Sequence, residues 1–185
     1  MKLTCRMVSI PFQSAFSHHR AKRAVSESFW VEASHLGQRG IGEGCPRSYV
    51  TGETPESCKA FFERIAPLAS TGINDLHALQ TFRKEHRDDI LLNPSAWCAI
   101  ELAMLDLLAR IQGQSVEVYL GWLVLQGPFR YSGVLGSDIG GVFEEKLNAH
   151  VDLGFQDYKL KWDRDPVSNR SRFEALKALV PNAKI

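Results

Sequence analysis

The chain has 185 residues, enough for one large domain or two small ones, and its 44% hydrophobic and 23% charged residues are typical of globular proteins. With 22 basic and 21 acidic residues, the composition does not indicate an electrostatic nucleic-acid binder. No apolar run is long enough to span a bilayer, and the N-terminus lacks the apolar core and cleavage site of a secretion signal. We therefore expect a cytoplasmic protein without nucleic-acid or membrane partners.

The four cysteines have neither CxxC spacing nor the Cys/His spacing of a metal site. They are Cys5, Cys45, Cys58 and Cys98. A disulfide framework is unusual in a cytoplasmic protein of this size. We expect reduced and mostly buried thiols.

The first third of the chain predicts three strands. Residues 3–10 alternate roughly between apolar and polar, 29–33 are aromatic and β-branched, and 37–44 form a glycine-rich turn and strand. Three neighbouring strands in this order predict an antiparallel meander.

Helices are predicted next. Thr54, Pro55 and Glu56 form a good helix start, with a capping hydroxyl, a proline in the first turn and an acid near the positive end of the helix dipole. Asp75 is expected to begin a second helix.

The longest predicted helix covers residues 94–113 and is apolar nearly all round. Such a helix is expected to be central and buried. Glu101 and Asp106 are its main acidic interruptions. We expect them to bond neighbouring backbone, although they are also possible ligands.

The pattern changes again near residues 126–129. Strand, helix, strand, helix and the first step of a strand follow at 131–135, 142–153, 155–162, 169–180 and 184–185. Strands and helices that alternate with short links predict parallel βαβ units.

Two lysines lie two residues apart in the strand predicted at 155–162. Lys159 and Lys161 share one face of that strand, whereas Tyr158, Leu160 and Trp162 share the other. In a βα barrel the outer face of a strand packs under helices, and the inner face can carry function at the carboxyl end of the strand. The pattern fits such a strand with both lysines pointing inward.

Two ammonium groups held close together disfavour each other's charge, so the pKa of one lysine is expected to fall. A lysine with a lowered pKa can accept a proton near neutral pH, while the remaining cation can hold a carboxylate. The pair therefore suits abstraction of a proton next to a carboxylate. The spacing alone also fits, and by itself favours, an edge strand with solvated lysines.

Four segments, in order, resemble the enolase superfamily, in its mandelate racemase and muconate lactonizing enzyme branch. They are VEASHLGQRGIGEGCPRSYVTGET, NPSAWCAIELAMLDLLARIQG, GFQDYKLKWDRD and RFEALKALVPNAKI. They are similar to the family's capping-domain strands and loop, its long helix, its second barrel strand with the K-x-K motif, and the helix and strand start before its metal-binding segment.

The resemblance implies a fold class of two parts. Residues 1–126 are expected to form an α+β capping domain, an antiparallel three-stranded meander with helices. Residues 127–185 are expected to form the first βα units of a TIM-type barrel that is incomplete in this chain. A barrel of this kind needs about 250 residues, and only two βα units and the opening of a third fit after Gln126.

The resemblance also implies a chemistry. In this family a Mg²⁺ ion, held by acids on the third to fifth barrel strands, stabilises the enediolate formed when a proton α to a carboxylate is removed. Matched to the K-x-K motif, Lys161 is the candidate base and Lys159 its electrostatic partner. Phe16, His18 and Tyr49 are candidate substrate contacts, because two segments, around residues 16–20 and 47–52, match the family's mobile capping loops.

The family's metal acids and its opposite-face base follow where this chain ends, so no metal ligand is named. The chain is expected to be the N-terminal portion of a racemase, epimerase or cycloisomerase that is inactive as this fragment. Its substrate class would be an N-acylamino acid, a dipeptide or a muconate.

Two alternatives stay open beside the fragment. In the first, the chain assembles with a second polypeptide that supplies the missing strands; in the second, it is a non-catalytic oligomerising or binding module derived from the family. Because a partial parallel sheet exposes an unpaired edge and an uncovered face, we also expect homo-oligomerisation, edge pairing or partial disorder beyond residue 126.

Overall fold

The structure of the chain is a computed structural model that describes residues 1–18, 21–138 and 140–185. Of residues 13–18, 21 and 22 it describes the backbone only.

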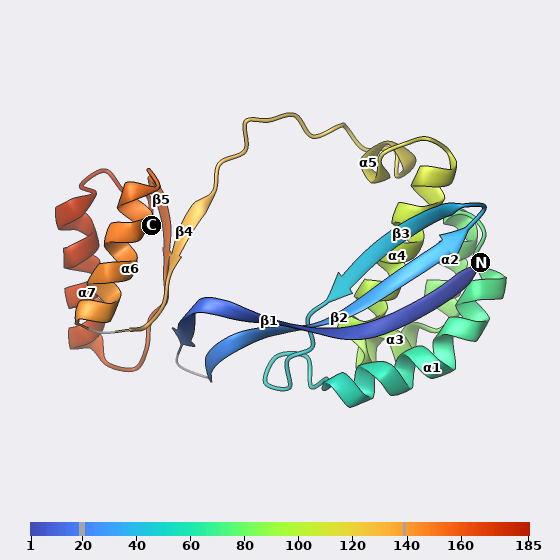
Figure 1. Cartoon of the computed structure of the whole chain (residues 1–185), viewed down its shortest axis with the longest axis horizontal. Coiled ribbons are helices and arrows are strands. Elements are labelled where there is room, and N and C mark those ends of the chain that lie inside the picture. The colour runs from blue at the N-terminus through green and yellow to red at the C-terminus, as the bar shows by residue number, and fades with distance from the viewer. Residues whose placement is uncertain (19–20, 139) are drawn as a thin grey trace. The chain divides into compact units, whose positions relative to one another are not determined.

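The chain forms two compact units. The first consists of Met1–Ile10 and Ser26–Leu125, and the second consists of Pro11–Val25 and Gln126–Ile185. Figure 1 shows the elements of each unit. The three-stranded sheet and the parallel strand pair are separate sheets.

The three-stranded sheet has the order β1-β2-β3 (Figure 1). Its strands are β1 (Lys2–His18), β2 (Ala21–His35) and β3 (Gln38–Gly44). The last two are antiparallel, with Phe29 opposite Gly44 and His35 opposite Gln38. The predicted meander is confirmed, but β1 extends beyond residue 10 and β2 begins before residue 29, so both strands are longer than predicted.

Five helices follow in the first unit. They are α1 (Pro55–Gly72), α2 (Leu76–Glu85), α3 (Arg87–Leu92), α4 (Pro94–Ile111) and α5 (Val116–Tyr119). The predicted starts are confirmed: Thr54 and Ser57 form a capping box at α1, and Asp75 caps α2 by accepting from the backbone N–H of Ala78 at 2.7 Å. The short helices α3 and α5 were not predicted.

The core of the first unit is built where β3 lies directly on α4. A Cβ at Gly42 would overlap the backbone carbonyl oxygen of Ala99, and one at Gly44 would overlap that of Ser95. Glycines in the strand and small residues on the helix thus let the two backbones approach closely. Ile100 and Leu107 of α4 are fully buried, which confirms its prediction as a central helix.

The two acids of α4 differ from each other in their contacts. Asp106 accepts a hydrogen bond from the backbone N–H of Ile41 at 3.0 Å and pairs with Arg110 at 2.8 Å. Its expected bond to backbone is therefore confirmed. Glu101 instead forms an ion pair with Arg83 of α2 at 3.6 Å.

The second unit contains a parallel βαβ arrangement, as predicted. Its elements are β4 (Ser132–Leu135), α6 (Gly141–Asp152), β5 (Asp157–Leu160) and α7 (Pro166–Leu179). Ser132 pairs with Asp157 and Leu135 with Leu160. A further parallel bridge joins Asp157 to Lys184, so the predicted start of another strand is confirmed.

A separate hydrophobic cluster holds the second unit together. Its largest members are Leu135, Phe143, Leu147, Tyr158, Leu160 and Leu176. The predicted strand was too long at its carboxyl end. It was predicted to run to Trp162, but β5 ends at Leu160, and Trp162, predicted to share this face, is 57% exposed.

All four cysteines are free thiols. Only Cys58 is buried, while Cys45 and Cys98 are exposed, so the expectation of mostly buried thiols is wrong. Burial, and then the neighbouring Glu53 carboxylate, raise the pKa of Cys58 to about 12. Among the described residues, no helix has the length and apolar character needed to cross a bilayer.

Candidate functional site

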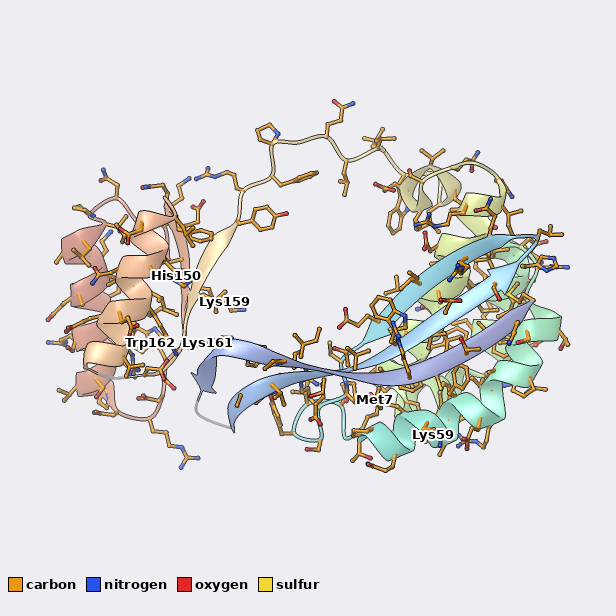
Figure 2. The ribbon with its side chains drawn as sticks, viewed as in Figure 1. Met7, Lys59, His150, Lys159, Lys161 and Trp162 are labelled. Carbon is orange, nitrogen blue, oxygen red and sulfur yellow. The ribbon has the colours of Figure 1, made fainter. Side chains whose placement is uncertain are left out.

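Lys159 lies in β5, and Lys161 directly follows the last residue of that strand. Tyr158 and Leu160 are buried in the cluster beneath α6 and α7, whereas Lys159 is exposed and Lys161 is half-buried. Figure 2 shows Lys159 on the side of the strands opposite these helices. Val134 of β4 pairs with Lys159 in the register and is also exposed.

Lys161 is anchored at the carboxyl end of the strand. Its backbone N–H donates to the carbonyl oxygen of Leu135 at 2.9 Å, so the last bond of the ladder fixes its position. Partial burial, and then the positive charge of Lys159, lower the pKa of Lys161. The two ammonium groups are therefore close enough to influence each other.

A buried arginine joins the loops that follow the two strands. Arg172 of α7 is only 3% exposed, and it donates to the carbonyl oxygen of Ser137 after β4 at 3.2 Å. It also pairs with the Asp163 carboxylate after β5 at 3.1 Å. One side chain thus connects both carboxyl-terminal loops of the sheet, two residues beyond Lys161.

The turn after β5 is fixed by short polar side chains. The Asn169 side chain accepts from the backbone N–H of Asp163 and donates to its carbonyl oxygen, both at 3.0 Å. Asp165 caps α7 by accepting from the backbone N–H groups of Val167 and Ser168. Sequence reasoning missed this network. The signal was the Asp and Asn cluster directly after the K-x-K strand.

The arrangement provides two kinds of chemistry on one face. An exposed ammonium such as Lys159 can bind a carboxylate, and an amine with a lowered pKa such as Lys161 can accept a proton. Within the described ranges, neither Lys159 nor Lys161 forms an ion pair with an acidic side chain. The nearby Asp157 is paired with Arg130 instead, at 2.9 Å. Both lysines are therefore available to an anionic molecule.

The other candidate residues are less fully described. Phe16 and His18 lie in β1, where a loop was predicted, and their side chains fall outside the described residues. Tyr49 is half-buried in a turn of the first unit, whereas the lysine pair belongs to the second unit. Among the predicted site residues with described side chains, Lys159 and Lys161 are thus the only two that belong to the same unit.

The turn that carries Tyr49 is held firmly. The carbonyl oxygen of Arg47 accepts from the backbone N–H groups of Val50 and Thr51, both at 2.8 Å. The Arg47 guanidinium donates to the carbonyl oxygen of Glu27 in β2 at 2.8 Å. These bonds fix the turn against the sheet.

Magnesium does not fit the residues that the structure describes. Among them, no three or more His, Cys, Asp or Glu side chains are grouped as metal ligands would be.

The fold is therefore an α+β capping domain followed by the first parallel βα units of a barrel. Solved structures with this fold include a dipeptide epimerase from Methylococcus capsulatus complexed with Mg and L-Arg-D-Lys, at 24% identity and a TM-score of 0.83, covering 100% of this chain and 51% of that one. The L-Ala-D/L-Glu epimerase from Bacillus subtilis is 20% identical with a TM-score of 0.82, covering 97% and 50%. An N-succinyl Arg/Lys racemase from Bacillus cereus is 22% identical with a TM-score of 0.81, covering 97% and 49%.

The chain thus spans about half the length of these epimerases and racemases. It has the fold of the N-terminal portion of mandelate racemase/muconate lactonizing enzyme proteins, a structural class that also includes a protein of Herpetosiphon aurantiacus. The fold inferred from the sequence resemblance is confirmed. No protein-family model matches the chain, and no curated protein gives a significant match.

Proposed function

We propose that this chain is the N-terminal portion of a racemase or epimerase that removes the proton α to a carboxylate. The observation that carries the proposal is the position of Lys159 and Lys161 at the carboxyl end of β5, where Lys159 is exposed and the pKa of Lys161 is lowered. The fold shared with epimerases and racemases supports it. In this proposal residues 1–126 form the capping domain and residues 127–185 begin the barrel.

Lys161 acts as the base in the proposed reaction. Its neutral amine takes the α-proton, and the electron pair left on carbon is delocalised into the substrate carboxylate as an enediolate. The ammonium group of Lys159 stabilises the extra negative charge on that carboxylate. Because burial and Lys159 both lower the pKa of Lys161, more of its amine is neutral near physiological pH than for an ordinary lysine.

The proposed substrates are dipeptides or N-acylamino acids. Two of the structural neighbours are epimerases of dipeptides, and a third is a racemase of N-succinyl Arg/Lys. Phe16, His18 and Tyr49 are proposed to contact the substrate. Mg²⁺, present in the Methylococcus capsulatus and Enterococcus faecalis structures, is proposed to bind acidic residues outside this chain.

The experiment has two steps. First, the nucleotide sequence after codon 185, or a neighbouring gene, is read for a segment that supplies acidic strand ends. The completed protein is then incubated in D2O with Mg²⁺ and a library of dipeptides and N-acylamino acids, and loss of the α-proton signal is followed by NMR. We expect exchange at the α-carbon of at least one substrate class.

Two substitutions assign the roles in that assay. Lys161→Met should reduce exchange by about 10³-fold or more, because the base is lost. Lys59→Met, an exposed lysine of α1, is the matched control and should leave exchange unchanged. Exchange that survives Lys161→Met contradicts the assignment of the base, and a completed protein that exchanges nothing in the library favours the non-catalytic module.

A further inference from the structure

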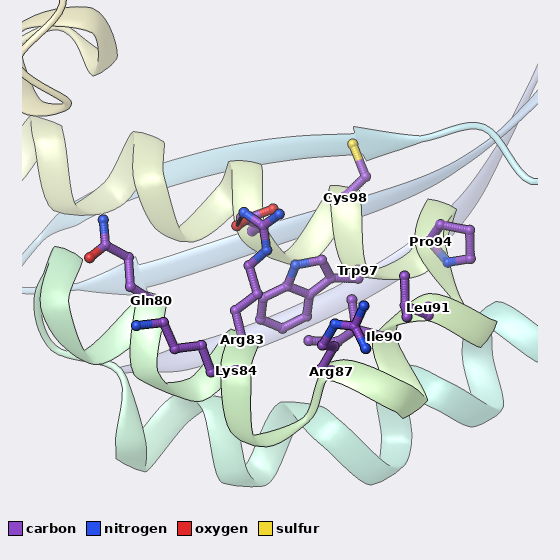
Figure 3. A pocket seen from close by; sticks show the side chains of 10 residues that line it. Gln80, Arg83, Lys84, Arg87, Ile90, Leu91, Pro94, Trp97 and Cys98 are labelled. Atoms are coloured by element: carbon purple, nitrogen blue, oxygen red, sulfur yellow. Dashed lines mark ion pairs between the residues drawn. The ribbon is translucent and has the colours of Figure 1, made fainter.

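The first unit contains a hollow between α2, α3 and α4. Figure 3 shows it with the side chains that line it, among them Arg83, Arg87, Ile90 and Trp97. Its volume is about 520 Å³, which falls within the range of small-molecule sites. We call it the α2–α4 hollow. The proposed proton transfer uses none of its residues.

A buried donor without a partner lines this hollow. Trp97 is 3% exposed, and its indole Nε1 is buried without a hydrogen-bond partner in the described part of the chain. The ring is held in place by stacking on Phe82, with 5.7 Å between centroids and 8° between planes. A buried N–H without an acceptor costs free energy, so an acceptor supplied by a ligand would be favoured there.

The charge of the hollow is predominantly positive. Arg83, Lys84 and Arg87 line it, against the single carboxylate of Glu101. The Arg83–Glu101 pair is long at 3.6 Å and its arginine is 65% exposed, and the Arg87–Asp88 pair at 3.7 Å is exposed on both sides. Exposed pairs of this length hold their partners weakly, so both guanidinium groups can turn to a ligand.

The remainder of the lining is apolar. Ile90, Leu91 and Pro94 form one side, together with the face of the Trp97 ring. Figure 3 shows the indole nitrogen on the ring edge towards Arg83, and Pro94 and Leu91 on the other side of the ring. The hollow therefore combines cationic side chains and a buried donor without a partner with apolar side chains.

We propose that the α2–α4 hollow binds a small organic anion with an apolar body. Its carboxylate or phosphate accepts from the Trp97 N–H and lies between Arg83 and Arg87, after Arg83 has turned away from Glu101. Its apolar part packs against Ile90 and Pro94. This site is independent of the lysine pair, so it can be tested whether or not the chain takes part in proton transfer.

The test uses the chain as it is, with 4-(trifluoromethyl)phenylacetate as the probe and the uncharged 4-(trifluoromethyl)phenylacetamide as its matched control. Fluorine NMR should show saturable binding of the acid with a Kd of about 1 mM or tighter, and binding of the amide about fivefold weaker or more. In the proton spectrum the indole N–H of Trp97, assigned by its loss in Trp97→Phe, should move downfield as the acid binds.

Substitutions locate the anion. The double variant Arg83→Gln, Arg87→Gln should weaken binding of the acid about tenfold and leave the amide unchanged. Arg39→Gln is the control, because Arg39 also forms a long exposed pair, 3.8 Å from Glu32, but lies on β3 outside the hollow. Both arginines of the double variant are exposed, so the fold is retained and circular dichroism verifies it.

Any of three results overturns the proposal. They are the absence of saturation up to about 10 mM probe, equal affinity for acid and amide, and a double variant that binds like Arg39→Gln. A stationary Trp97 resonance during saturable binding would place the anion elsewhere and overturn the role of the indole donor.

Discussion

The two units cover their sheets in different ways. In the first unit β3 lies on α4 with glycines against helix backbone, so close approach of main chains forms the core. In the second unit large apolar side chains, such as Leu135, Leu147 and Leu176, separate the sheet from its helices. The packing of sheet on helix therefore depends on the absence of side chains in the first unit and on the volume of side chains in the second.

The uncovered faces differ as well. On the first sheet, Arg39 of β3 is balanced by Glu32 of β2 at 3.8 Å. On the second sheet, Lys159 and Lys161 repel each other, and the pKa of Lys161 is lowered in part for that reason. A surface that keeps two like charges together is less stable than one that pairs them, which is the physical basis for treating the second face as the candidate site.

The largest expected effect is that of Gly42→Ala. The added Cβ would overlap the backbone of Ala99, which cannot move without displacing α4, so we expect the free energy of unfolding of the first unit to fall by at least about 3 kcal/mol. Gly72→Ala, at the end of α1 in the same unit, is the matched control, since its Cβ would meet only a Phe82 side-chain carbon at an ordinary 3.8 Å. Urea denaturation measures both, and equal stability of the two variants would refute close backbone packing.

Arg172→Met should have the next largest effect, confined to the second unit. It removes the bonds to Ser137 and Asp163 and leaves that carboxylate without its partner, at a cost of about 2–3 kcal/mol. Hydrogen exchange of the β4 and β5 amides measures the local loss. Arg170→Met, an exposed arginine of the same helix, serves as the control. Unchanged protection in Arg172→Met would show that the arginine does not hold the two loops.

Glu53→Gln tests the start of α4. The buried Glu53 carboxylate accepts from the backbone N–H groups of Ser95 at 2.8 Å and Ala96 at 2.9 Å, and an amide can accept only one of them. We expect a loss of about 1–2 kcal/mol from thermal denaturation, against little change for Glu63→Gln, an exposed acid in the middle of α1 whose pair with Lys59 is long at 3.7 Å. The pKa of Cys58 should also fall in Glu53→Gln, because the carboxylate contributes to raising it.

The smallest effect is expected for Lys159→Met, and it concerns titration. Removing the neighbouring cation should raise the pKa of Lys161 towards that of an ordinary lysine, as measured by carbon NMR of methylated lysines, and Lys59→Met should leave it unchanged. Since the folded-state pKa of Lys161 lies below its unfolded value, stability should rise with pH between the two values. That rise should be smaller in Lys159→Met. An unchanged pKa of Lys161 in Lys159→Met would show that the charge of Lys159 does not act on Lys161.

Local signals in the sequence determined much of this protein. Thr54, Asp75 and Pro94 marked helix starts correctly, because capping and the fixed φ of proline act within one turn. The period of two correctly placed Lys159 on the exposed side of β5 and Tyr158 and Leu160 on its buried side. The resemblance carried by four quoted segments predicted the fold that the structural neighbours share.

Only the tertiary structure decided the contacts that join distant segments. Arg172 bonds to Ser137, which is 35 residues away in the sequence, and Glu53 bonds to Ser95, which is 42 residues away. In the α2–α4 hollow, packing brings the cation of Arg83 beside the buried indole of Trp97. No short sequence window contains such pairs, since they depend on how helices and strands pack. The same holds for Trp162, whose exposure followed from the end of a strand two residues earlier.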